Sequence, residues 1–192
     1  MTIQRKELKH LVKQIKRGLS SYYVQQIGNE VPFINIRDVS DGIIHVETVE
    51  HVKIKETGAL EKSRIRPKDV ILTAKGSAFK AAVASKEIKD YVISANIVAF
   101  TLTNEVLPEL VVAYLNSTAG QKELHARSAG IAQKALNMRS LMELKIPVPP
   151  MHKQKVLAEY LSLSNEYDIF MQREQELRKK IKNKIIQNQM MR

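Results

Sequence analysis

The sequence contains no cysteine and no tryptophan, and only seven of its 192 residues are glycine. The absence of cysteine excludes disulfides, cysteine-ligated zinc sites and thiol catalysis. No apolar run approaches the roughly 18 residues that a membrane helix needs, and the first ten residues lack the apolar stretch of a signal peptide. With 44% hydrophobic and 27% charged residues, the composition is typical of a folded protein. We therefore expect a cytoplasmic protein that makes no contact with a membrane.

Motifs for cofactor and nucleotide chemistry are also absent. The sequence has no glycine-rich strand-to-helix turn and no Asn/Asp-Pro-Pro-aromatic tetrapeptide, the two features that a DNA methyltransferase needs. It has no GxxxxGK motif, which excludes a nucleotide-driven motor. None of the five histidines is paired with another at the i, i+4 spacing of a helical metal site. We expect no catalytic residue, no cofactor and no metal ion.

One fragment keeps an enzymatic alternative open. Lys68-Asp69, followed by Glu87 and Lys89, is a loose match to the two carboxylates and lysine that bind Mg²⁺ and activate water in nucleases. Asp69 is more simply interpreted as a turn residue before an apolar strand. A Mg-dependent nuclease therefore remains the alternative to a non-catalytic binding protein.

The net charge of +11 is unevenly distributed. Residues 1–30 hold 6 basic and 2 acidic residues, residues 31–119 hold 11 and 11, residues 120–150 hold 5 and 2, and residues 151–192 hold 9 and 5. The middle of the chain is balanced, and the positive excess lies near the two ends. An excess of this kind favours a polyanionic partner, because phosphate contacts release counterions. The charge is equally compatible with a nucleic-acid partner and with a basic protein that has no such partner.

The hydrophobic periodicity changes along the chain. Leu8, Leu11, Val12 and Ile15 fall on one face at helical spacing, which predicts a helix over residues 3–17 that ends at Gly18. Short segments rich in Val, Ile and Thr then predict closely spaced strands separated by Gly, Pro and Asp, within residues 31–39, 42–54, 69–76, 80–85 and 96–103. A helix is expected over residues 109–116, after Pro108. The strands are too closely spaced for a parallel βαβ repeat, so the pattern predicts a compact, β-rich α+β domain.

A proline-rich segment, residues 147–150, predicts a rigid extended hinge between two domains. No glycine or proline follows it, and apolar residues then recur in steps of four and three. This heptad seam comprises Val156, Tyr160, Leu163, Tyr167, Phe170, Leu177 and Ile181, with Glu174 interrupting it. A helix of about 40 residues would be about 60 Å long and could not bury the seam against one small domain. We therefore expect domain 1–146, hinge 147–150, and a long helix 151–192 that forms a coiled coil with another helix.

Three groups of basic and amide side chains on expected loops are candidates for DNA contact, because such groups suit phosphate and base-edge contacts. In order of preference they are Lys75, Ser77 and Lys80; then Lys134, Asn137 and Arg139; then Asn35 and Arg37. A further set, Lys62, Arg64, Arg66 and Lys68, alternates along the chain and would share one side if the segment were extended.

Taken together, the motifs resemble those of specificity subunits of type I restriction-modification systems, in a form with a single target-recognition domain. Ile146–Leu161, IPVPPMHKQKVLAEYL, resembles the proline motif that closes the recognition domain of that family and opens its helix, with Gln154 at the family's glutamine. The segments 31–44, 66–77, 110–124 and 135–150 resemble further parts of the family pattern. The likeness extends over about residues 6–190.

The resemblance implies a non-catalytic subunit that reads DNA for its partners, the adenine-methyltransferase subunits and the restriction or translocase subunit. Typical members have two recognition domains separated by long antiparallel helices, whereas this sequence has one domain and one helix. A homodimer through the seam would restore the arrangement and read a palindromic split site. A truncated or split product that pairs with a different half is the rival explanation. An assembly or inhibitor protein that docks partner subunits without reading DNA is a further alternative.

Overall fold

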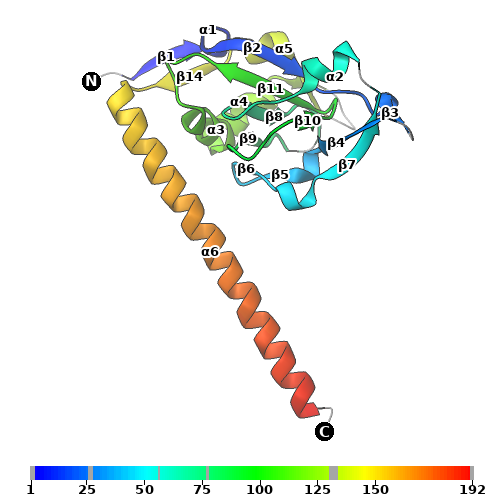
Figure 1. Ribbon diagram of the computed structural model, residues 1–192. Helices are drawn as coiled ribbons and strands as arrows, with labels where there is room; N and C mark the ends of the chain where they lie inside the picture. Colours follow the sequence, from blue (N-terminus) through cyan, green and yellow to red (C-terminus); the bar gives the residue numbers. More distant parts are fainter. Residues whose placement is uncertain (1–2, 26–27, 56, 77, 130–133, 191–192) are drawn as a thin grey trace.

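The computed structural model of the protein describes residues 3–25, 28–55, 57–76, 78–129 and 134–190. Two four-stranded sheets form the centre of an N-terminal domain, and one long helix projects from it (Figure 1). This α+β architecture with a long C-terminal helix confirms the predicted fold class. Within the described part of the chain, no helix combines the length and the apolar character that crossing a membrane requires.

The first sheet has the strand order β2-β11-β8-β9, and all neighbouring strands are antiparallel. Its strands are β2 (Val12–Arg17), β11 (Ile97–Leu102), β8 (Val70–Thr73) and β9 (Ala81–Val83). Successive side chains of a strand point to opposite faces. Val70 and Leu72 of β8 accordingly join one apolar cluster, and Ile71 joins a second. The sheet is buried on both faces, which explains why its central strands are nearly continuous apolar runs.

The second sheet has the order β10-β4-β7-β3. Its strands are β10 (Val92–Ile93), β4 (Asn29–Ile34), β7 (Glu50–Ile54) and β3 (Val24–Gln25). Strand β10 is parallel to β4, and the other pairs are antiparallel. Val31 and Phe33 of β4 pack with Ile54 of β7 in a third apolar cluster. The sheet has β3 at its edge, at the end of the domain remote from the start of the long helix (Figure 1).

Short elements complete the domain. Three two-stranded pairings join β1 (Gln4–Glu7) to β14 (Lys145–Val148), β5 (Val39–Ser40) to β6 (Ile43–Ile44), and β12 (Ser128–Ala129) to β13 (Ala135–Leu136). The helical elements are α1 (Leu8–Leu11), α2 (Gly58–Ser63), α3 (Pro108–Asn116), α4 (Thr118–Ala126) and α5 (Met138–Met142), with 3-10 turns η1 (Ser21–Tyr23), η2 (Ile36–Asp38) and η3 (Val46–Thr48). Pro147, in the segment predicted as a hinge, lies in β14 opposite Arg5.

The predicted helix over residues 3–17 is wrong, because this segment forms β1, one helical turn and β2. Leu8 and Leu11 are buried, as the pattern required, but Ile15 is exposed and Lys16 is buried. Lys16 Nζ lies 2.6 Å from Asp69 Oδ2, so an ion pair with a distant residue places it inside. Pairing of β2 with β11 therefore overrides the helical spacing of four apolar residues.

The other predictions along the domain have mixed outcomes. The expected helix after Pro108 is confirmed as α3, and each of the five strand-rich segments contains at least one strand. The expected extended run from Lys62 to Lys68 is wrong at its start, because Thr57 caps α2 and Lys62 lies in this helix. Arg64 instead forms ion pairs with Glu61 and Asp90.

The long helix α6 (Met151–Met190) has 40 residues, which corresponds to about 60 Å. Its first turn is fixed to the domain by the buried side chain of Gln154. The amide oxygen accepts a hydrogen bond from Leu107 N at 2.8 Å. The amide nitrogen donates to Glu105 O at 2.8 Å and to Pro149 O at 2.9 Å. These three bonds set the direction in which the helix leaves the domain.

Candidate nucleic-acid interface

The loop between β8 and β9 is paired with the segment that precedes α5. Lys75 forms an isolated antiparallel bridge with Ala135. Gly76 N donates to Lys134 O at 3.0 Å, and Leu136 N donates to Ala74 O at 2.9 Å. Two of the three candidate groups, which are about 60 positions apart in the sequence, therefore form one short ribbon with β12 at its other side. Lys75 and Lys134 are both exposed on it.

The third candidate group lies beside this ribbon. Gly76 has φ +126°, a conformation that glycine adopts readily. A Cβ atom at Gly76 would lie 4.0 Å from Ile36 Cδ1, so η2, between Asn35 and Arg37, is next to the ribbon. The structure thus brings residues from all three predicted groups to one region of the domain surface. Ser77, one of the first-choice residues, lies outside the described residues.

Several of the candidate side chains also have structural partners. Asn137 caps α5 by accepting a hydrogen bond from Ser140 N at 3.2 Å. Arg139, in the same helix, is exposed. Lys80 is half-buried, and its backbone N–H donates to Thr73 Oγ1 at 2.8 Å. Lys75, Lys134 and Arg139 therefore offer the most accessible cations of these groups.

Arg37 forms an ion pair with Glu50, and its Nε lies 3.7 Å from Asp38 Oδ1. The side-chain hydrogen bond with Glu50 is the main reason that the pKa of Arg37 is raised above its usual value, followed by the charge of Glu50. Arg37 is 56% exposed, so solvent screens this pair. Glu50 of β7 positions the guanidinium of Arg37, and a DNA phosphate would compete with Glu50 for it.

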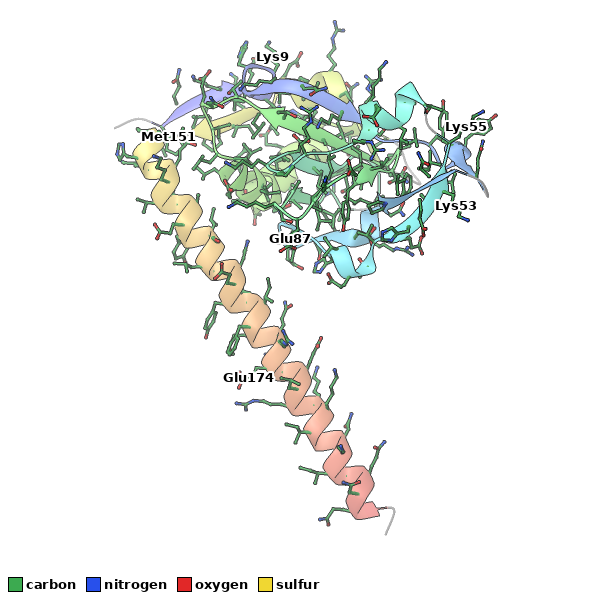
Figure 2. The ribbon with its side chains drawn as sticks, in the orientation of Figure 1. Lys9, Lys53, Lys55, Glu87, Met151 and Glu174 are labelled. Carbon is green, nitrogen blue, oxygen red and sulfur yellow. The ribbon has the colours of Figure 1, made fainter. Side chains whose placement is uncertain are left out.

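Asp69, the first carboxylate of the nuclease alternative, has a structural role. It is buried and paired with Lys16. Its other oxygen accepts a hydrogen bond from Thr101 Oγ1 at 2.6 Å, and Oδ2 also accepts one from Arg66 N at 2.8 Å. Glu87 is exposed in a turn at the domain surface (Figure 2). In the ranges that the structure describes, no group of three or more His, Asp or Glu side chains could hold a metal ion.

An aromatic and basic surface at the edge of the second sheet was missed from the sequence. Tyr22 is 84% exposed and forms an edge-to-face pair with Tyr23, with ring centroids 5.7 Å apart. Lys53 and Lys55, at the end of the neighbouring strand β7, are also exposed (Figure 2). In the sequence, only the two adjacent tyrosines in a polar segment could have indicated this surface. The pairing of β3 with β7 is what places Tyr22 and Tyr23 near Lys53 and Lys55.

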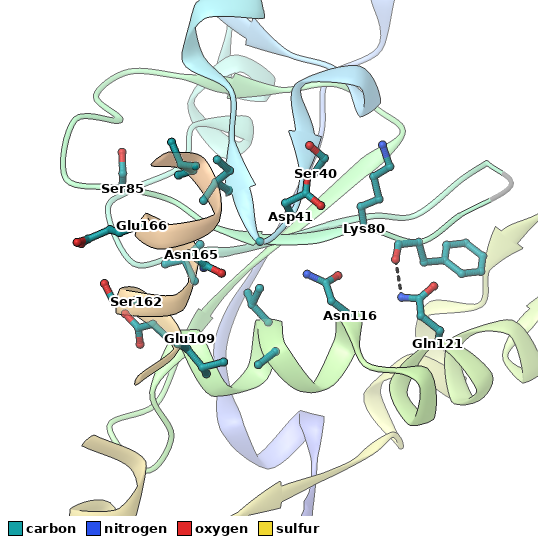
Figure 3. A pocket seen from close by; sticks show the side chains of 18 of the residues that line it. Ser40, Asp41, Lys80, Ser85, Glu109, Asn116, Gln121, Ser162, Asn165 and Glu166 are labelled. Carbon is teal, nitrogen blue, oxygen red and sulfur yellow. Dashed lines mark hydrogen bonds between the residues drawn. The ribbon is translucent and has the colours of Figure 1, made fainter. Parts of the chain in front are cut away.

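The domain and α6 enclose a groove of about 650 Å³. Asn165 of α6 points toward Asp41 and Asn116 across it, whereas Glu166, at its rim, points away from them (Figure 3). Asn116 Oδ1 accepts a hydrogen bond from Ala81 N, and its Nδ2 donates to Ala81 O, both at 2.9 Å. This amide pairs with the backbone of Ala81 at the outer edge of β9, where Val83 N also donates to Gly42 O at 3.2 Å, and covering the edge reduces its tendency to pair with another chain.

The heptad seam lies on the other side of α6 from the domain. Met151, Gln154, Ala158 and Leu161 are buried or half-buried, and they recur on the side that faces the domain. The apolar residues of the seam are between 52% and 67% exposed: Val156, Tyr160, Leu163, Tyr167, Phe170, Leu177 and Ile181. The distal half of α6 projects away from the domain (Figure 1). The seam therefore has no partner within the described residues of this chain.

Comparisons with known proteins agree with this architecture. Residues 3–185 match the family model described as the type I restriction modification DNA specificity domain. The chain is 21% identical over 137 residues to the type I restriction enzyme EcoBI specificity subunit of Escherichia coli. This alignment covers 69% of the chain and 29% of that protein.

Solved structures show the same fold. The S subunit of a type I restriction-modification system from M. genitalium has a TM-score of 0.59 at 17% identity and covers 86% of this chain. The HsdS subunit from Thermoanaerobacter tengcongensis has a TM-score of 0.64 at 20% identity and covers 90%. The chain spans 40% and 39% of these two proteins and 29% of the curated relative.

Proposed function

Because the chain belongs to the family of type I restriction-modification DNA specificity domains, we propose that it reads one half of a split DNA site and performs no chemistry itself. Residues 1–146 are the recognition domain, residues 147–150 connect it to the helix, and residues 151–192 form the helix that sets the distance to a second domain. The methyl-transfer and cleavage reactions would belong to partner subunits.

The observation that carries this proposal is the meeting of three basic segments at one surface. Lys75 and Lys134 lie on paired segments, and η2 with Arg37 is adjacent. Such cations supply the phosphate contacts that position a protein on DNA, and neighbouring amides can read base edges. Lys75 and Arg37 come from the part of the chain where positive and negative charges balance, so their clustering with Lys134 is a property of the fold.

The shape of this region suits the major groove, which admits a two-stranded β-ribbon. Lys75 and Ala135 face each other across the bridge, so their side chains share one face. Lys134 precedes Ala135 and therefore points to the opposite face. The face of Lys75 and Ala135 is the outward one, because Leu136, on the other face, is buried in the core. The proposed contact residues remain Lys75, Ser77, Lys80, Lys134, Asn137, Arg139, Asn35 and Arg37.

A second copy of the chain is the proposed partner of the seam. Two-fold pairing through α6 would place two recognition domains at opposite ends of a helical spacer, and the pair would read a palindromic split site. Sedimentation of the full chain at micromolar concentration should give a dimer. A stable monomer would favour pairing with a different half-subunit instead.

Double-stranded DNA, the adenine-methyltransferase subunits and the restriction or translocase subunit are the further proposed partners, because the resemblance to the family implies them. The chain spans well under half of the relatives named above.

Selection from a library of random duplex DNA tests the reading of sequence. The full chain, with and without an adenine-methyltransferase subunit, should enrich two inverted half-sites at a fixed separation. Enrichment of no sequence in either sample would contradict the proposal and favour a protein that only assembles its partners. Cleavage that needs Mg²⁺ but no other subunit would favour the nuclease alternative.

A further inference from the structure

Charged residues line one flank of the exposed seam of α6, and the sign of their charge changes along the helix. Glu159 and Glu166 lie beside the first half of the seam, and Arg173 and Lys180 lie beside the second half. All four are exposed, and they recur every seven residues, so they occupy the same flanking heptad position. The flank is therefore negative near the domain and positive near the distal end.

We infer that a second copy of this chain packs on the seam in one antiparallel register, in which Tyr160 meets Leu177 of the second copy. This inference rests on the proposed dimer and specifies its geometry. Antiparallel helices pack each a residue against a d residue of the partner. The resulting layers pair Val156 with Ile181, Tyr160 with Leu177, Leu163 with Glu174, and Tyr167 with Phe170, each occurring twice around the two-fold axis.

The flanking charges agree with this register. It brings Glu159 beside Lys180 of the second copy, and Glu166 beside Arg173. The two-fold axis repeats each pair, so four opposite-charge pairs border the seam. Exposed pairs of this kind contribute little stability individually, but they select partner and orientation.

The neighbouring registers place like charges together. Sliding the second helix by one heptad in one direction brings Arg173 opposite Arg173 across the axis, and Phe170 opposite Glu174. Sliding it by one heptad in the other direction brings Glu166 opposite Glu166 and leaves Ile181 uncovered. A parallel, in-register pair places Glu174 against Glu174 in the seam and Arg173 beside Arg178. Within the seam from Val156 to Ile181, the antiparallel register with Tyr160 opposite Leu177 therefore has the best charge complementarity, and the like charges of Lys153 and Lys184 meet only in the layer beyond it.

Glu174, the polar residue of the seam, is compatible with this arrangement. Its Oε1 accepts hydrogen bonds from Arg178 Nη2 at 2.7 Å and from Arg178 Nε at 3.0 Å. This pair within the helix neutralises the carboxylate beside the apolar layer. Arg178 itself lies opposite Leu157 of the second copy, where its aliphatic stem can cover an apolar side chain that is 45% exposed in the single chain.

Disulfide formation can test the register, because the chain has no cysteine of its own. The double variant Tyr160→Cys/Leu177→Cys should form disulfide-linked dimers under mild oxidation. Leu163→Cys/Ile181→Cys, which would pair in the antiparallel register shifted by one heptad or in a parallel pair, should not. Leu177→Cys alone should form no disulfide either, because residue 177 of one copy meets residue 177 of the other only in a parallel pair.

Charge reversal gives a second test that leaves the apolar seam intact. Glu166→Lys should weaken dimerisation about tenfold, because it turns two attractive pairs into repulsive ones. Adding Arg173→Glu to the same chain should restore the dimer. Glu176→Lys, an equal change at an exposed position away from the seam, should have no effect.

The outcomes separate the register from the dimer. A full chain that sediments as a monomer and forms no disulfide in any variant contradicts the dimer itself, and the inference with it. A dimer that is cross-linked through the shifted pair or through Leu177→Cys alone contradicts only the register. The same holds if the second reversal fails to rescue the first.

Discussion

The side-chain oxygen of Gln154, in the first turn of α6, accepts a hydrogen bond of 2.8 Å from the backbone N–H of Leu107, which precedes α3. Together with the bonds from Gln154 Nε2 to Glu105 O and Pro149 O, this contact uses both ends of a buried amide. The helix that would space two recognition domains is thereby held to the domain at a defined angle.

Replacing Gln154 by leucine should lower the free energy of unfolding by about 3 kcal/mol, because buried backbone groups lose their partners at about 1–3 kcal/mol each. Gln172→Leu, at an exposed position of the same helix, is the matched control and should change it by less than about 0.5 kcal/mol. Urea denaturation measures both. Equal effects of the two substitutions would mean that Gln154 does not anchor α6.

Lys16→Met should be strongly destabilising, because it leaves the buried Asp69 carboxylate without its cation. Breaking one side of a buried pair costs about 3–5 kcal/mol. Lys9→Met removes an exposed lysine from its pair with Glu7 and should have little effect on unfolding by urea. If Lys16→Met were as stable as the parent protein, Asp69 would be free for another role, and the nuclease alternative would regain support.

Asn116→Leu should expose the edge of β9. The variant loses both hydrogen bonds to Ala81, and we expect a loss of about 1 kcal/mol because nearby water can replace part of them. Amide hydrogen exchange is the direct measurement, and Ala81 N–H should exchange faster. The control is Asn104→Leu, at an exposed site with one long contact of 3.4 Å to Lys13, which should leave the exchange rate of Ala81 N–H unchanged. If Asn104→Leu raised that rate as much as Asn116→Leu does, the proposed role of Asn116 would be ruled out.

Lys75→Ala and Lys134→Ala should each weaken DNA binding for all sequences and reduce the slope of log K against log salt by about one. The control is Lys179→Ala, which removes the same charge from an exposed position on the distal part of α6. Fluorescence anisotropy across a salt series, with the methyltransferase subunit present, provides the slopes. A slope that falls equally for Lys179→Ala would indicate a general charge effect and not a contact at the ribbon.

The sequence was informative where a pattern has one physical meaning. The absence of glycine and proline after Pro150, with apolar residues in heptad spacing, predicted α6 correctly. The family motif pointed to Gln154 but not to its partners, because Glu105 and Leu107 lie in a loop nearly fifty residues earlier. Contacts over such a separation leave no local periodicity.

The N-terminal segment shows the opposite case. Four apolar residues at helical spacing predicted a helix, although Lys16 is buried and Ile15 is exposed. A buried lysine is unfavourable unless a carboxylate meets it, and that carboxylate belongs to Asp69, directly before β8 and more than fifty residues away in the sequence. In the same way, residue type alone suggested the three basic loop groups, and only the pairing of Lys75 with Ala135 shows that two of them share one ribbon.

In the proposed dimer, two copies present the Lys75 ribbon to the two halves of one DNA site. Lys75→Cys, the only thiol in a chain without cysteine, can carry an iron chelate that cleaves nearby DNA. With a duplex obtained by selection, and with the methyltransferase subunit present, we expect two clusters of cleavage, one in each half-site and related by two-fold symmetry. Cleavage spread evenly along the duplex, or confined to one half-site, would contradict this proposal.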